Sequence, residues 1–275
     1  MKIKTWVIGG IVYLVMVVAG YSVVTGENPL NSGEMNHGDH EGQQEEQDHG
    51  EHSNDEVDHS EHGSSSESQV QTDVTYKEGR LIVSLEDDEG NVPQLEENHE
   101  KLMHLIVVST NLEDYVHLHP EIDENNMYLS EVTLEPGYYK AFVDISPKDK
   151  KYRVEENELS VGDLEENEAH LTPTSYTQDV AEKKVTLEAS GLSTDETSVL
   201  SFDLHGEIPL PYLGALGHVV ILNESADEFI HVHPTSETET TFETHFDTPG
   251  MYKVWAEFNF EDEGVVVFPY VIEVN

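Results

Sequence analysis

Three histidines and a proline occur twice in this chain with identical spacing. They are His104, His117, His119 and Pro120 in the first copy, and His218, His231, His233 and Pro234 in the second. The two segments are 17 residues long, align without a gap and are identical only at these four positions. A repeat that changes its apolar residues but keeps its histidines indicates that the histidines do something that packing does not require.

The residues around these histidines predict a β-hairpin. The stretches His104 to Val108 and Tyr115 to His119 are apolar and rich in β-branched residues, and a polar stretch separates them. Alternate residues of a strand share a face, so both histidines of His-x-His point the same way. If His104 pairs across the hairpin with either of them, three imidazoles converge; a slip of one residue would turn His104 to the opposite face.

Three imidazoles at one end of a hairpin favour metal binding. We therefore predict one set of metal ligands in each copy, with the first copy supplying His104, His117 and His119, and the second His218, His231 and His233. An acid follows each copy seven residues after a Pro-Gly turn, Asp144 in the first and Glu257 in the second. These acids could be a fourth ligand, an acceptor for an imidazole N–H, or solvated strand ends. The alternative for the histidines is hydrogen bonding that fixes the loops.

The segment 26–73 is a second candidate metal-binding region. It is acidic and lacks Lys and Arg. Its composition cannot bury enough apolar surface to offset chain entropy, so it predicts a disordered tail. Imidazole with carboxylate suits Zn²⁺, Cu²⁺ or Ni²⁺. The alternative is a hydrophilic stalk whose histidines are incidental. The predicted ligands of the tail form three His-x-x-His pairs, which are His37 with His40, His49 with His52, and His59 with His62.

The charge of the chain restricts its partners. It has 57 acidic and 13 basic residues, a net charge of −44, and no cysteine. Nucleic-acid binding is excluded by repulsion from phosphate, and disulfides and thiolate metal sites are excluded by composition. The charge attracts cations, although adaptation to a salty or alkaline environment would explain it as well.

Short strand-like runs separated by polar or Gly/Pro turns predict an all-β fold, with two tandem β-sandwich domains of one kind. We predict a signal anchor or signal peptide at 1–25, the tail at 26–73, the first domain at 74–162, a linker at 163–173 and the second domain at 174–275.

The N-terminus predicts export. An apolar run of 20 residues, Thr5 to Val24, follows Lys2 and Lys4 and would span roughly 30 Å as a helix. We expect a single-pass membrane protein with an extracellular C-terminal part, or a secreted protein if residues 1 to about 20 are cleaved.

At the segments Leu81 to Asp144 and Val199 to Glu257, the chain resembles bacterial extracytoplasmic proteins associated with copper or other heavy metals. Those proteins carry immunoglobulin- or cupredoxin-like β-sandwiches with a His…His-x-His-Pro segment and a Gly-x-Tyr-Lys/Arg strand. A weaker likeness is to YtkA-like domains. The second copy departs from the first at Thr235, where the first has Glu121.

Three function classes follow. The favoured one is a surface-anchored protein that sequesters or delivers Cu²⁺ or Zn²⁺, with a metal transporter as a possible partner. The second is an adhesion or envelope-interaction module with structural histidines. The third is a metal-dependent enzyme, because three histidines can hold a zinc ion and leave one coordination position open for a substrate. The sequence has no nucleophile elbow, P-loop or His-Glu-x-x-His motif to support this class. We therefore predict no enzymatic activity.

Overall fold

The computed structural model describes residues 68–162, 168–232, 234–236 and 238–275. Every regular element in these ranges is a β-strand, and they contain no helix long and apolar enough to span a membrane.

Several predicted features lie outside the described residues. They include the anchor at 1–25 and one predicted ligand of the second repeat, His233. The tail histidines also lie outside, so their role as metal ligands stays a prediction; they are His37, His40, His49, His52, His59 and His62.

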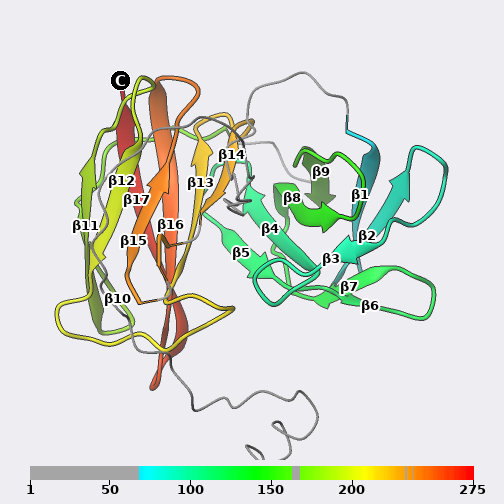
Figure 1. Ribbon diagram of the computed structural model, residues 1–275, viewed down its shortest axis with the longest axis horizontal. Helices are drawn as coiled ribbons and strands as arrows, with labels where there is room; N and C mark the ends of the chain where they lie inside the picture. Colours follow the sequence, from blue (N-terminus) through cyan, green and yellow to red (C-terminus); the bar gives the residue numbers. More distant parts are fainter. Residues whose placement is uncertain (1–67, 163–167, 233, 237) are drawn as a thin grey trace, which may run out of the picture. The chain divides into compact units, whose positions relative to one another are not determined.

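The first repeat is a sandwich of two sheets (Figure 1). Its strands are β1 (Val70–Lys77), β2 (Arg80–Asp87), β3 (Leu95–Glu96), β4 (Met103–Ser109), β5 (Tyr115–Leu118), β6 (Glu121–Ile122), β7 (Tyr128–Glu131), β8 (Gly137–Pro147) and β9 (Glu156–Val161). One sheet has the order β1-β2-β7-β6, and the other has β3-β8-β4-β5 with β9 also paired to β8. β1 begins at Val70, inside the range 26–73 that composition predicts to be disordered, because its Val70 and Val74 are buried in the core.

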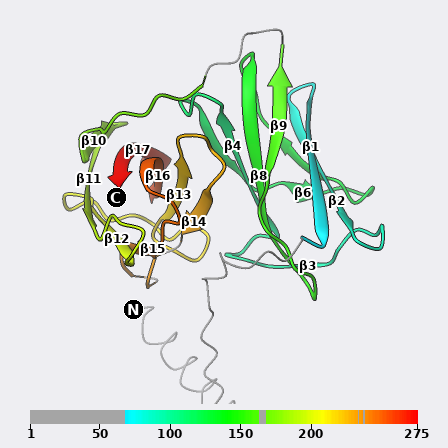
Figure 2. The ribbon, with the colours of Figure 1, turned by 90° about the horizontal axis from the view of Figure 1, so that it is seen from above.

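The second repeat has a similar plan (Figure 2). Its strands are β10 (Thr177–Val180), β11 (Lys183–Ser190), β12 (Ser198–Asp203), β13 (His218–Asn223), β14 (Phe229–Val232), β15 (Thr241–Thr244), β16 (Gly250–Phe260) and β17 (Gly264–Val274). The sheet orders are β10-β11-β12-β15 and β14-β13-β16-β17. The prediction of an all-β fold with two tandem β-sandwiches is confirmed.

Burial separates two kinds of strand. Strand β2 alternates buried and more exposed residues, as a strand with one solvated face should. All residues of β4 are buried, as are those of β13 up to its last residue. The unbroken apolar runs of β4 and β13 are therefore covered on both faces: one face of each strand packs inside its own sandwich, and the opposite face packs against the other repeat.

A hydrophobic core shared by the two repeats covers the faces of β4 and β13 that point away from their own sandwiches. Its buried members are Ile106, Val108, Leu112, Phe142, Val220, Leu222, Ala226 and Trp255 from the two repeats, with Ala169 from the segment between them. Two aromatic pairs stack across it with ring centroids 4.9 Å apart, Phe142 on Phe229 and Tyr115 on Trp255. Phe142 and Trp255 occupy equivalent positions of the repeat, as do Tyr115 and Phe229. The two sandwiches belong to one compact unit.

Candidate metal centre

The two hairpins place their histidines as the alternation of side chains predicts. β4 pairs with β5 so that Ile106 lies opposite His117, which puts His104 and His117 on one face. In the second repeat Val220 lies opposite His231, and the same face carries His218. The predicted hairpin and the convergence of the first three imidazoles are confirmed: the rings of His117 and His119 lie 4.7 Å apart and within 5.3 Å of His104.

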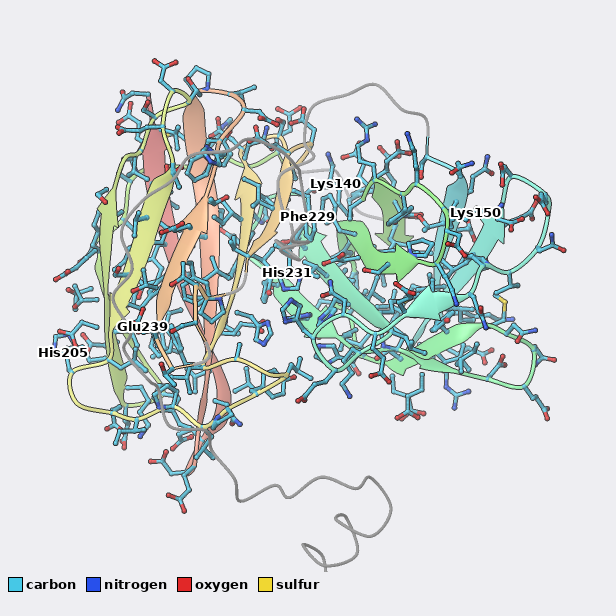
Figure 3. The ribbon with its side chains drawn as sticks, viewed as in Figure 1. Lys140, Lys150, His205, Phe229, His231 and Glu239 are labelled. Atoms are coloured by element: carbon cyan, nitrogen blue, oxygen red, sulfur yellow. The ribbon has the colours of Figure 1, made fainter. Side chains whose placement is uncertain are left out.

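The two sets of histidines form one cluster. The ring of His231 lies 5.2 Å from that of His104 and 5.4 Å from that of His117. His231 and Phe229, both on β14, face the first repeat (Figure 3). The sequence predicts one ligand set per repeat, whereas the fold brings the described histidines of both sets, which leave out His233, to the face that the repeats share.

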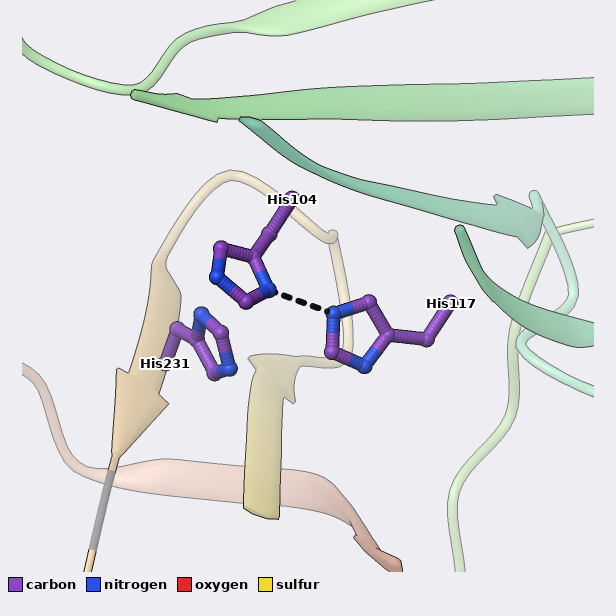
Figure 4. A group of neighbouring side chains, drawn as sticks. All are labelled: His104, His117 and His231. Atoms are coloured by element: carbon purple, nitrogen blue, oxygen red, sulfur yellow. Dashed lines mark hydrogen bonds between the residues drawn. The ribbon is translucent and has the colours of Figure 1, made fainter. Parts of the chain in front are cut away.

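Three histidines of this cluster could hold one ion. His104, His117 and His231 each offer a ring nitrogen, and these three nitrogens all lie within 4.8 Å of one another (Figure 4). His104 Nδ1 is 3.1 Å from His117 Nε2. Two of the ligands come from the first repeat and one from the second, so the candidate centre exists only when the repeats are in contact.

In each of these three imidazoles, the ring nitrogen that is not a candidate ligand donates a hydrogen bond to an oxygen. Two of these hydrogen bonds cross between the repeats. His117 Nδ1 donates to Glu257 Oε2 at 2.9 Å, and His231 Nδ1 donates to Asp144 Oδ2 at 2.7 Å. Each acid therefore binds the central histidine of the other repeat. Of the roles predicted for Asp144 and Glu257, the structure shows the imidazole acceptor.

Backbone carbonyls hold the two flanking histidines. His104 Nε2 donates to the carbonyl oxygen of Asn98 at 3.1 Å, and His218 Nε2 donates to that of Tyr212 at 2.9 Å. In both repeats the accepting residue lies six positions before the histidine. Such contacts fix which nitrogen of an imidazole is available to a metal.

Burial keeps the flanking imidazoles neutral. Desolvation lowers the pKa of His104 to about 4 and that of His119 to about 3, with the neighbouring histidines adding to the effect. The pKa values of His218 and His231 are also lowered, first by burial. Neutral imidazole is the form that binds metals, so the cluster is prepared for an ion at neutral pH.

The two carboxyls differ. Burial raises the pKa of Asp144, although nearby histidines oppose this effect. Burial also acts to raise the pKa of Glu257, but the hydrogen bond from His117 and the charge of that ring outweigh it, and the pKa is lowered. Without an ion, His104 Nδ1 must accept because its Nε2 donates to Asn98.

Comparison with known proteins identifies a family. The family described as "Domain of unknown function (DUF8832)" matches residues 59–162 and again 178–275. The chain belongs to this family. The two matches cover both repeats, and the family's description names no activity. No curated protein matches.

Solved structures give a distant likeness. The FN1-FN3 domains of chicken CNTN1 are 13% identical over 76% of this chain and 66% of that one, with a TM-score of 0.23. Two fibronectin type-III domains of chicken tenascin are 11% identical over 74% and 98%, with a TM-score of 0.25. A tetra-tandem repeat of a large adhesion protein is 11% identical over 75% and 49%, with a TM-score of 0.24. TM-scores this low carry no argument about function.

Sequence reasoning missed the shared face. One signal pointed to it, because His104 to Val108 and His218 to Leu222 are unbroken apolar runs after the histidine, which is typical of a strand covered on both sides. It also missed Asn98 and Tyr212, which act through backbone carbonyls and so leave no pattern in the sequence.

Proposed function

We propose that this protein binds a divalent transition metal ion, Zn²⁺ or Cu²⁺, in a single site shared by its two repeats, and that it does so outside the cytoplasm. The proposal rests on one observation: three ring nitrogens from both repeats lie within 4.8 Å of one another. The function is binding, for sequestration or delivery, rather than catalysis.

The distances suit a small metal ion. Three nitrogens bound tetrahedrally at about 2.0–2.1 Å from zinc would be separated by about 3.3 Å. His104 Nδ1 and His117 Nε2 are already 3.1 Å apart, so only His231 has to approach. The carboxylates behind His117 and His231 add basicity to these ligands and offset the charge of the ion.

A cavity adjoins the cluster. It has a volume of about 870 Å³, and both His231 and Asp144 contribute to its lining. Acids dominate the rest of the charged lining, among them Glu155, Asp227 and Asp247. A cleft lined by one sign of charge concentrates counter-ions, so this cavity favours the arrival of cations.

The remaining parts of the proposal come from the sequence. The His-x-x-His tail at 26–73 would collect ions weakly, because ordering a disordered chain costs entropy. The apolar run near the N-terminus would hold the protein at the membrane, where a metal transporter is a possible partner. The resemblance to copper- and heavy-metal-associated proteins agrees with this role.

The second candidate is an adhesion or envelope-interaction module whose histidines are structural. The observation on its side is that the protein itself supplies partners to the cluster: His104 bonds to His117 and Asn98, and His117 also bonds to Glu257. Such a network could serve only to join the two repeats.

Metal content distinguishes the two candidates. The full-length chain, with its six tail histidines replaced by Gln, is loaded with Zn²⁺, desalted and measured for metal and protein. We expect one ion per chain, and none after the further substitution His117→Gln. The matched control is His205→Gln, at a half-exposed histidine that bonds to Thr186 away from the cluster. If the tail-substituted chain retains no metal, the structural candidate replaces the proposal.

A further inference from the structure

We propose that His218 is the fourth ligand of this centre, which makes it a closed four-histidine site with two ligands from each repeat. This inference rests on the proposed function. It assigns the first repeat His104 and His117, and the second repeat His218 and His231. The bound ion would then clamp the repeats together.

The four rings approach a tetrahedral arrangement. In a tetrahedral zinc site with a Zn–N distance of about 2.0–2.1 Å, imidazole centroids lie about 3.2 Å from the ion and about 5.2 Å from each other. The three distances among His104, His117 and His231 are 5.3, 5.2 and 5.4 Å. These three rings are thus already spaced as ligands of one ion.

His218 occupies the remaining corner. Its ring lies 6.4 Å from His104, 6.2 Å from His117 and 6.0 Å from His231. The three distances are nearly equal, as required of a fourth ligand, and each exceeds the tetrahedral value by about 1 Å. A single small movement of this ring toward the other three would complete the site.

The repeat makes the four ligands two equivalent pairs. His104 and His218 are equivalent, and each donates from Nε2 to a backbone carbonyl, which leaves Nδ1 as the ligating nitrogen. His117 and His231 are equivalent, and each donates from Nδ1 to an acid of the other repeat, which leaves Nε2. An ion bound between these two pairs would meet equivalent ligands from both repeats.

The charges also balance. Four neutral imidazoles bring no charge to a divalent ion, and a buried ion without compensation is costly. The carboxylates of Asp144 and Glu257, each one hydrogen bond behind a ligand, supply two negative charges. Tetrahedral nitrogen coordination suits Zn²⁺ better than Cu²⁺, which prefers square-planar or tetragonal sites. A closed tetrahedral site is typical of structural zinc, whereas catalytic zinc keeps a position open.

His119 is the rival for the fourth position. Its Nε2 is buried and has no hydrogen-bond partner among the described residues. Its ring contacts those of His104 and His117 at 4.9 and 4.7 Å, and it faces Tyr212 at 6.1 Å. These contacts put His119 beside the first-repeat pair rather than at the fourth corner, so it serves as a matched control.

Cobalt absorption spectroscopy tests the inference. The full-length chain with its six tail histidines replaced by Gln is titrated with Co²⁺, alone and with His218→Gln or His119→Gln added. We expect the parent chain to bind one Co²⁺ with the intense visible absorption of a four-coordinate ion, unchanged by added imidazole. His218→Gln should weaken binding by at least about 100-fold, since the loss of an outer partner alone costs about 10–100-fold. Its residual complex should change colour when imidazole fills the vacated position.

The outcomes separate the inference from the proposed function. If the parent chain binds no Co²⁺, the proposed function fails. If the parent binds Co²⁺ but the His218→Gln variant keeps the parent's affinity and spectrum, the inference alone fails. A loss of Co²⁺ affinity in the His119→Gln variant would then make His119 the fourth ligand. If His218→Gln does not fold by circular dichroism, X-ray absorption of the zinc-loaded parent decides: four imidazoles support the inference, and three imidazoles with an oxygen overturn it.

Discussion

Replacing Glu257 by Gln should weaken both the metal-free fold and the metal site. Glu257 is 3% exposed and accepts the Nδ1 proton of His117 at 2.9 Å. Glutamine keeps the size of the side chain and one acceptor, but it removes the negative charge. The change therefore tests the charge with little disturbance of packing.

The magnitude follows from the charged hydrogen bond that is lost. A hydrogen bond to a charged group contributes about 1.5–3 kcal/mol, and the amide oxygen of Gln leaves only a neutral acceptor for His117 Nδ1. We therefore expect a loss of about 1–3 kcal/mol. For a folded unit of about 200 residues this lowers Tm by about 2–12 °C.

The metal site should respond as well. Loss of a carboxylate behind a ligating imidazole reduces metal affinity about 10–100-fold, which is about 1.4–2.8 kcal/mol. Thermal unfolding followed by circular dichroism in EDTA gives the first effect, and zinc titration against a competing chelator gives the second. The control is Glu243→Gln, the same substitution at an exposed position of β15. Equal behaviour of the two variants in both assays would refute the role assigned to Glu257.

Three further predictions follow from the shared cluster. Free Zn²⁺ at 100 times Kd should stabilise the chain by about 2.7 kcal/mol and so raise its Tm. Either His117→Gln or His231→Gln alone should remove this rise in Tm completely. If half of the rise remained, the chain would have two independent sites. Burial lowers the pKa of His104 to about 4 in the folded chain, whereas its pKa in the unfolded chain is about 6.5. Between these two values the unfolded state binds a proton that the folded state does not bind. Urea unfolding of the metal-free protein should therefore show stability that is level above pH 6.5 and falls toward pH 4, less steeply after His104→Gln. The Trp255 side chain is 2% exposed and stacks on Tyr115. Trp255→Ala should therefore lower the free energy of unfolding by about 3–5 kcal/mol in the same urea assay. A loss under about 1 kcal/mol would contradict the importance of the shared core.

The fold could be predicted because its signals are local. Alternation of side chains along a strand fixed the face of His117 and His119, and hairpin pairing then brought His104 to them. The repeated Pro-Gly turns and strand runs were enough to recognise two copies of one sandwich. These inferences need only neighbours within one hairpin or one strand.

The shared site could not be predicted because its contacts are distant in the sequence. Glu257 lies 140 residues from His117, and Asp144 lies 87 residues from His231. No periodicity links positions so far apart, and each acid is nearer in sequence to the histidines of its own repeat. The unbroken apolar runs of β4 and β13 showed that both faces were covered, but they did not show that the other repeat covers the second face.

Anomalous diffraction at the zinc edge, from crystals of the zinc-loaded full-length protein, tests the central claim most directly. We predict one strong peak in the folded part of each chain, bounded by His104 and His117 of the first repeat and His231 of the second. Two separate peaks, each within one repeat, or no peak between these three rings would contradict the shared site.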